Sequence, residues 1–308
     1  MDYKRANRVF LYMILASLIF SLGYGAVYSL YGWEMNVLLN NFFSEVVVLI
    51  PAVIAILVSR EPFREVIPFK KIKVSSGLLS AVYGALLMPV TTFIAMATMM
   101  VVKNHIEGMS DEILSMPMWQ MLFSIGIFGP FVEEILFRGV FLNSYKRSGR
   151  TLAAILLSSL LFGIVHMNFN QFAYGVVMGI MFALVFEATG SVLAPFIAHG
   201  AFNSIEVLAM YIPTAISGEA REAVTRLDIN SSNLAALGVS FVGAAVCTVL
   251  AICLVYKIAS IEGRTGEFEG ILKKKGEGKL VSFPLLAGIA IAAGFMVAIE
   301  VMSRISGT

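Results

Sequence analysis

Residues 123–142 read FSIGIFGPFVEEILFRGVFL, a mainly apolar stretch that is long enough to cross a bilayer. The whole chain has a similar composition, because 58% of its 308 residues are hydrophobic and only 14% are charged. A typical soluble domain has about 25% charged residues, and a soluble core of this chain length could not bury so much apolar surface. The sequence therefore predicts an all-α, polytopic transmembrane helical bundle.

A spanning helix needs about 20 mostly apolar residues, and the chain contains about nine such runs. The predicted spans are 8–31, 36–59, 76–103, 118–144, 151–167, 171–188, 190–211, 234–256 and 282–302. The fifth and sixth are short, so a count of eight or nine spans stays open, and with it the side of the C-terminus. The loops are mostly brief, and we expect residues 1–308 to form one integral membrane domain. Its core spans would be 118–211, flanked by spans in 1–117 and 212–308.

Basic residues are divided unevenly between the two sides that nine spans would define. One side would hold most of the 22 Lys and Arg residues, namely Lys4, Arg5, Arg8, Arg60, Arg64, Lys70, Lys71, Lys73, Lys146, Arg147, Arg150, Lys257, Arg264, Lys273, Lys274, Lys275 and Lys279. The other side would hold Lys103, Arg221, Arg226 and Arg304. Because cytoplasmic loops carry the excess of Lys and Arg, we expect a cytoplasmic N-terminus in a prokaryotic inner membrane. The basic stretch 61–75 is expected to be an interfacial helix or a plain loop.

The fourth predicted span carries three ionisable side chains, Glu133, Glu134 and Arg138. A charged residue at the centre of a spanning helix costs about 2.5–3.5 kcal/mol, and such residues usually face the bundle interior and serve a function there. Glu134 and Arg138 are one helical turn apart and can pair, which predicts a structural role. Glu133 points about 100° away and has no local cation. A buried carboxylate of this kind readily takes up a proton, so Glu133 is predicted to be a general base.

Pro130, with Gly126 and Gly129 beside it, precedes these acids in the same span. Proline removes a helix hydrogen bond and frees a carbonyl group one turn back. In a spanning helix it commonly means only a kink, but next to two glutamates it favours an opening for water or substrate beside Glu133.

Two further spans contribute polar groups at one-turn spacing, Phe162 with His166 and His199 with Asn203. The chain has only three histidines, and two of them lie in apolar spans. A single histidine in a span is more often a packing residue than a catalyst. Two histidines, an unpaired glutamate and an asparagine on three helices together favour a functional site.

Taken in order, the patterns Glu133-Glu134-x-x-x-Arg138, Phe162-x-x-x-His166 and His199-x-x-x-Asn203 resemble the three motifs of the CPBP family. This family, also called Abi, contains CAAX-protease and bacteriocin-processing intramembrane peptidases, among them the type II CAAX prenyl endopeptidases. The similarity covers about residues 130–204, where PFVEEILFRG, LFGIVHMN and GSVLAPFIAHGAFNS also resemble family sequences.

The resemblance implies a membrane-embedded, water-filled cavity in which a glutamate-activated water hydrolyses a peptide bond. Carried over to this chain, Glu133 and His166 would hold and deprotonate the water. His199 and Asn203 would stabilise the oxyanion, while Glu134, Arg138 and Phe162 would support the site. The substrate would be a peptide or lipidated protein, including prenylated CAAX-type proteins. Membrane lipids would be partners and nucleic acid would not.

Several alternatives stay open on the sequence. No cofactor is expected, but Glu133, His166 and His199 could also form a three-ligand zinc site with an open water position. Intramembrane acids and histidines occur in the proton relays of transporters as well, although the inverted repeats typical of such folds are not evident. A non-catalytic bacteriocin-immunity or scaffold protein is a third reading, which the intact motif set disfavours.

Overall fold

The computed structural model describes residues 1–102, 110–215, 234–273 and 276–306, and every regular element within these ranges is a helix. Seven helical segments of this described part are long and apolar enough to cross a membrane. They are α1 (Tyr3–Tyr31), α2 (Val37–Ser59), α4 and α5 together (Val74–Leu86 and Met88–Met99), α11 (Phe169–Thr189), α12 (Leu193–Ala215), α14 (Leu234–Ile261) and α16 (Phe283–Ser306). The predicted all-α membrane bundle is confirmed.

The other two predicted spans are also helical but differ in length or winding. The fifth is α10 (Thr151–Val165), which is short, as expected. The fourth is a continuous run of α7 (Met118–Met121), η2 (Leu122–Phe128), α8 (Gly129–Glu134), η3 (Ile135–Leu142) and α9 (Asn143–Lys146). The sixth span, expected to be short, is in fact the 21-residue helix α11. The remaining described helices, α3 (Phe63–Val66), α6 (Ser110–Ser115) and α15 (Thr265–Glu269), lie in connections.

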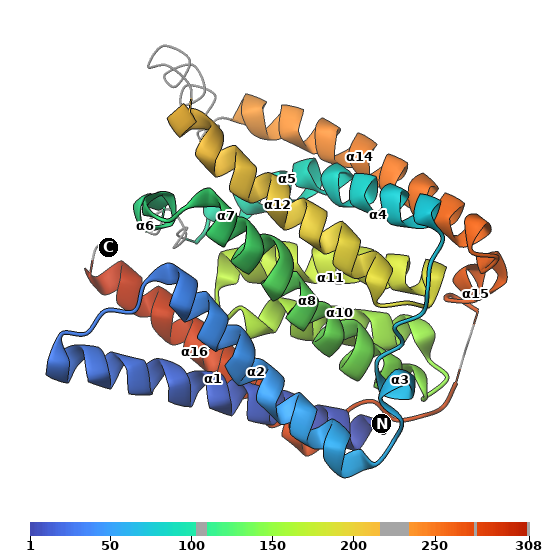
Figure 1. The fold of residues 1–308 in the computed structure, drawn as a ribbon, viewed down its shortest axis with the longest axis horizontal. Coiled ribbons are helices and arrows are strands. Elements are labelled where there is room, and N and C mark those ends of the chain that lie inside the picture. The colour runs from blue at the N-terminus through green and yellow to red at the C-terminus, as the bar shows by residue number, and fades with distance from the viewer. Residues whose placement is uncertain (103–109, 216–233, 274–275, 307–308) are drawn as a thin grey trace.

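The helices form a central layer with a group of helices on either side of it (Figure 1). α8, α10 and α11 lie in the middle, with α1, α2 and α16 packed together on one side. On the other side, α12 packs against α4 and against the fourth span, and α14 packs against α4 and α5. The motif-bearing segments are therefore neighbours although they are far apart in the sequence.

Gly84 sets the close approach of α4 to α12. A Cβ atom at this position would overlap the carbonyl oxygen of Ala198, the residue immediately before His199. Because the obstacle is backbone, neither helix can relieve the overlap by a side-chain rotation. The packing of α4 thus fixes the height and orientation of α12 at the histidine.

We expect Gly84→Ala to destabilise the bundle by about 1–3 kcal/mol or more, since overpacking against backbone forces two helices apart. Gly77→Ala is a matched control on the same helix, where the nearest atom to a new Cβ is Ile197 Cδ1 at 3.6 Å. That change should be neutral or slightly stabilising, because alanine favours helix over glycine. Thermal unfolding in detergent compares the two, and equal midpoints would contradict the proposed role of Gly84.

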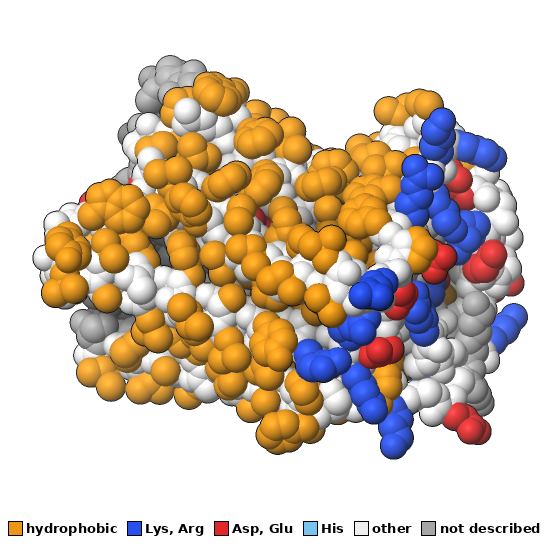
Figure 2. Space-filling view, turned by 60° about the horizontal axis from the view of Figure 1, so that its bottom comes forward, with side chains coloured by type: hydrophobic (Ala, Val, Ile, Leu, Met, Phe, Trp, Pro, Cys, Tyr) orange, Lys and Arg blue, Asp and Glu red, His pale blue; other side chains and the backbone are white. Residues whose placement is uncertain are grey.

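Basic side chains gather at one end of the molecule, and hydrophobic side chains cover most of the rest of the visible face (Figure 2). Contacts join the predicted basic segments there: Arg147 pairs with Glu61, and the Lys73 amide donates to Glu262. At the other end, Arg304 Nη2 donates to Val101 O over 2.8 Å. This division agrees with the predicted distribution of charge. Of the residues used for that prediction, Lys103, Arg221, Arg226, Lys274 and Lys275 lie outside the described ranges.

The stretch 61–75 contains the four-residue helix α3 and, from Val74, the start of α4, so a longer interfacial helix, one of the two alternatives, does not form in it. Val66 and Ile67 are buried instead, which anchors this connection to the bundle. The loop alternative is therefore the correct one for most of the stretch.

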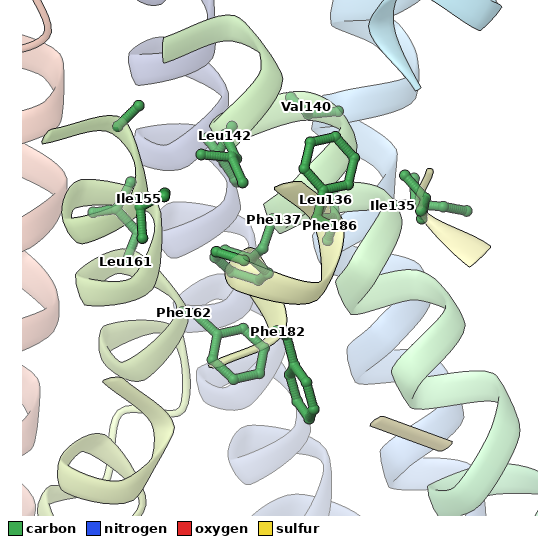
Figure 3. Packing of buried hydrophobic residues seen from close by; sticks show 14 of the residues in the cluster. Ile135, Leu136, Phe137, Val140, Leu142, Ile155, Leu161, Phe162, Phe182 and Phe186 are labelled. Carbon is green, nitrogen blue, oxygen red and sulfur yellow. The ribbon is translucent and has the colours of Figure 1, made fainter. Parts of the chain in front are cut away.

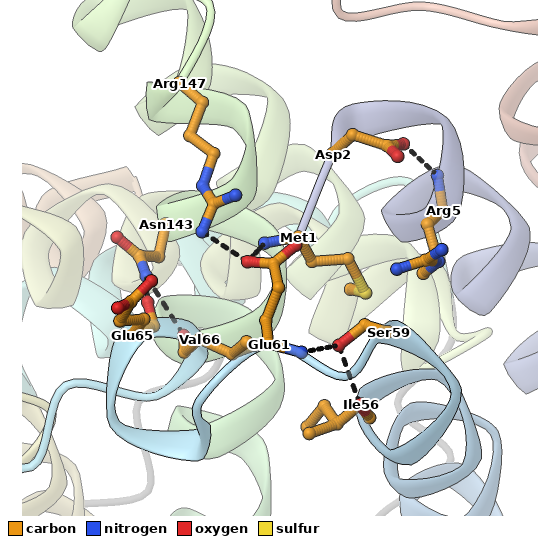
Figure 4. A network of polar contacts seen from close by, with 10 residues as sticks. All are labelled: Met1, Asp2, Arg5, Ile56, Ser59, Glu61, Glu65, Val66, Asn143 and Arg147. Atoms are coloured by element: carbon orange, nitrogen blue, oxygen red, sulfur yellow. Dashed lines mark hydrogen bonds and ion pairs between the residues drawn. The ribbon is translucent and has the colours of Figure 1, made fainter.

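A polar network fixes the basic end (Figure 4). Glu61 Oε2 lies 2.6 Å from both the Met1 amino group and Arg147 Nη2. The hydrogen bond from the Met1 amino group, assisted by Arg147, holds the pKa of Glu61 below its usual value. A carboxyl group with a lowered pKa stabilises the fold above its ordinary titration range and loses that contribution as the pH falls.

Candidate active site

The fourth span changes its winding on both sides of the acidic residues. The Gly129 amide donates to Ser124 O, and the Asn143 amide donates to Arg138 O, both five residues back. These are π-helical hydrogen bonds, which are rare and often occur at functional sites. The sequence predicted a disturbance at Pro130, and the structure shows that it takes the form of π-helical segments around α8.

Pro130 explains how Asn203 is held. In the π register the amide of residue 130 would bond to Ile125 O, but proline has no N–H. The Ile125 carbonyl instead accepts a hydrogen bond of 2.9 Å from Asn203 Nδ2. In an α-helix, proline at position 130 would have freed the carbonyl of Gly126 instead, which is one residue later in the chain. Asn203 keeps its second amide hydrogen for another acceptor.

We expect Pro130→Ala to lower kcat for peptide hydrolysis, the reaction that the family resemblance implies, by about tenfold. This corresponds to a rise of about 1.4 kcal/mol in the activation free energy. Alanine supplies an N–H that competes with Asn203 for Ile125 O and so loosens the asparagine. Pro51→Ala, inside α2 and away from the cavities, is the matched control for removal of a helix proline. Steady-state kinetics and thermal unfolding of both variants test this. An unchanged kcat for Pro130→Ala would show that Asn203 is held by other contacts.

Glu134 connects two of the motifs. Its Oε2 lies 3.0 Å from Arg138 Nε, as the one-turn spacing predicted. Its Oε1 lies 2.9 Å from His199 Nδ1, a contact that the sequence did not reveal. Both Glu134 and Arg138 are buried. The carboxylate therefore orients His199 in addition to pairing with Arg138.

Phe162 and Phe182, which belong to the buried hydrophobic cluster (Figure 3), lie against this ion pair. The Arg138 guanidinium lies 4.9 Å from the Phe162 ring centroid and 5.4 Å from that of Phe182, and its Nη2 donates to Gly179 O over 3.0 Å. Phe182 stacks on His199 with ring centroids 4.6 Å apart, and Phe162 makes T-shaped contacts with both histidine rings. Phe162 was predicted to support the site. Phe182 had no sequence signal, because an aromatic residue in an apolar helix is usual.

Glu133 lies between the two histidines. Its Oε2 is 3.5 Å from His199 Nε2, and its Oε1 is 3.9 Å from His166 Nε2. His166 Nδ1 lies 2.8 Å from Phe162 O, and His199 Nδ1 faces Glu134. Since both acceptors require a hydrogen on Nδ1, each neutral ring has its lone pair on Nε2, directed at Glu133. A proton or a water molecule placed between the Glu133 carboxylate and the two Nε2 atoms would give all three groups a hydrogen-bond partner.

A cavity of about 820 Å³ brings the predicted residues to a common space. Glu133, His166, His199 and Asn203 line it, together with residues of α2, α5 and α11. A second cavity of about 490 Å³ lies beside α1, α2 and α16, and Glu133 and His166 line it as well. Glu133 thus lines both cavities and can be approached from either one.

A shared zinc ion would need ligand atoms at about 2.0–2.2 Å from one point. Among the residues that the structure describes, no group of three or more His, Cys, Asp or Glu side chains is placed to hold a metal ion. Glu133 offers a different oxygen to each imidazole. The part of the chain that the structure describes therefore shows no preformed metal site.

Comparisons with known proteins agree with the geometry. Residues 115–205 match a family model described as "Type II CAAX prenyl endopeptidase Rce1-like". The chain is also 29% identical over 111 residues to "Putative membrane peptidase YdiL" of Bacillus subtilis (strain 168). That alignment covers 36% of this chain and 45% of the relative, and no solved structure matches. The segment 115–205, which carries all three motifs, is thus similar to the Rce1-like peptidases, and the chain spans less than half the length of the curated relative that it matches.

Proposed function

We propose that this protein is an intramembrane endopeptidase that hydrolyses a peptide bond of a membrane-associated substrate by means of a glutamate-activated water. The position of Glu133 carries the proposal: its carboxylate faces Nε2 of His166 and His199 inside a large cavity. The similarity of residues 115–205 to a peptidase family supports the same reaction.

In the proposed mechanism, Glu133 and His166 Nε2 accept hydrogen bonds from one water molecule. Glu133 removes a proton as the water oxygen attacks the substrate carbonyl carbon. His199 Nε2–H and the second amide hydrogen of Asn203 donate to the oxyanion that forms. His199 must be an imidazolium to donate from Nε2, and the Glu134 carboxylate at Nδ1 stabilises that charge.

The substrate is proposed to be a peptide or lipidated protein held at the membrane. Apolar side chains such as Met88, Met96 and Met178 line much of the larger cavity. The family name points to prenylated CAAX-type substrates, and the exposed apolar faces point to surrounding lipids. The basic end is proposed to face the cytoplasm of a prokaryotic cell, by the positive-inside rule.

The test is cleavage of a quenched-fluorescent farnesylated CAAX peptide by purified protein in detergent, with its unprenylated counterpart alongside. Wild type should cleave, His199→Ala should not, and a chelator should have no effect. Loss on chelation with recovery on adding zinc would instead make Glu133 a metal ligand. A folded wild-type protein that cleaves neither peptide, with variants that keep the cellular phenotype, would favour a non-catalytic binding protein.

A further inference from the structure

A second carboxylate, Glu45 of α2, reaches the same site from outside the three motifs and outside the family match. Glu45 lines both cavities, as Glu133 and His166 do. Its Oε1 lies 3.6 Å from the point that a Cβ on Gly129 would occupy. Gly129 is one helical turn before Glu133, so Glu45 lies over the face of α8 that bears the general base.

Among the described residues, none that lines the two cavities offers Glu45 a permanent positive charge. The described residues that line the two cavities include no Lys or Arg, and the titratable groups among them are Glu133, His166, Tyr174, His199 and Glu206. Glu45 Oε2 is buried and has no hydrogen-bond partner among the described protein atoms. An ionised, unpartnered carboxylate is costly to bury, and two carboxylates in one low-dielectric cavity are stabilised by sharing a proton.

Glu45 is not needed to attach α2 to the fourth span. Asn41, one turn earlier on α2, donates from Nδ2 to Ser124 Oγ over 2.8 Å. The Phe42 and Phe128 rings stack nearby with centroids 4.9 Å apart. A carboxyl group placed among these contacts, and directed at the cavity, calls for a chemical explanation rather than a packing one.

We infer that Glu45 is the general acid of the reaction: in its protonated form it delivers the proton that the leaving amine requires. This inference rests on the peptidase function proposed above and adds a residue to it. Glu133 supplies the base and Glu45 the acid, a division that two carboxyl groups in one cavity can maintain because only one of them is ionised.

The water oxygen forms a bond to the carbonyl carbon, one water proton passes to the Glu133 carboxylate, and the carbonyl electrons move to its oxygen. When those electrons return, the carbon–nitrogen bond breaks and the nitrogen takes the proton of the Glu45 carboxyl. Protonated Glu133 then returns its proton to the Glu45 carboxylate through the shared cavity. One water is consumed, and a carboxylic acid and an amine are released.

Leaving-group dependence tests this role. Wild type, Glu45→Gln and Glu133→Gln are compared on the farnesylated CAAX peptide and on a 4-nitrophenyl ester of the same farnesyl-cysteine acyl group. The ester releases a phenolate, which needs no proton to leave, whereas the peptide nitrogen must be protonated before it can leave as an amine. Glu45→Gln should lower kcat on the peptide by about 10²-fold and leave kcat on the ester nearly unchanged. Glu133→Gln should lose both reactions, and Glu300→Gln, in the exposed pair with Arg304, is the control for loss of a membrane glutamate.

The outcomes separate the two proposals. Equal losses on peptide and ester for Glu45→Gln, or no loss on the peptide, would overturn the acid role while the peptidase function stands. A wild type that cleaves neither substrate would overturn both. If Glu45→Gln does not fold, Glu45→Asp replaces it, since the shorter acid keeps a proton but withdraws it from the amine. It should be impaired on the peptide alone, and equal impairment on both substrates would again reject the inference.

Discussion

Glu133→Gln is expected to lower kcat by about 10⁴-fold, the upper end of what a general base contributes. Glutamine has nearly the same shape as glutamate, but its amide cannot remove a proton from water. It would also place an N–H₂ group or a weak acceptor between two Nε2 atoms that now face a carboxylate. KM should change little, because Glu133 acts on the water and not on the bound peptide.

Cleavage of the farnesylated CAAX peptide, with thermal unfolding as the folding control, measures this effect. Glu133→Gln should unfold at nearly the wild-type temperature, since Glu133 has no Arg or Lys partner among the described residues. A residual kcat within about tenfold of wild type would remove Glu133 from the role of general base.

Arg138→Met is expected to have the largest effect on stability. It leaves the buried Glu134 carboxylate without its guanidinium, and breaking a buried ion pair from one side costs about 3–5 kcal/mol. Arg138 also donates to Gly179 O and lies over two aromatic rings, so the same change loosens α11. Thermal or denaturant unfolding in detergent measures the loss.

A matched control exists at the surface. Glu300 and Arg304 pair at the same one-turn spacing, over 2.8 Å, but the Arg304 side chain is 58% exposed. Arg304→Met should therefore cost no more than about 1 kcal/mol. If both arginine variants lose the same stability, burial does not decide the strength of the Glu134–Arg138 pair.

The double variant Glu134→Gln with Arg138→Met separates structure from chemistry. It removes both buried charges, so much of the stability lost in Arg138→Met should return. Activity should stay low, because a neutral glutamine at His199 Nδ1 can accept a hydrogen bond but does not stabilise the imidazolium. A double variant that is both stable and active would exclude this role of Glu134.

Local patterns in the sequence were sufficient for much of the molecule. Apolar runs predicted the helical membrane bundle, since a spanning helix must bury its backbone polar groups within one continuous segment. The one-turn spacing predicted the Glu134–Arg138 pair, because residues four apart share a helix face. The three motifs also indicated the family whose model matches residues 115–205, since they are short and lie within single helices.

What the tertiary structure decided depends on contacts between helices. Glu134 and His199 are 65 residues apart, and no helical periodicity relates one to the other. The same holds for Phe182 against His199, for Asn203 on the Ile125 carbonyl, and for Glu45 beside the Glu133 cavity. Hydrophobicity and spacing determine which segments cross the bilayer and which side chains share a face. Close packing between helices, such as that of Gly84 on Ala198, then determines which helix faces meet. The meeting faces in turn determine which polar side chains become partners.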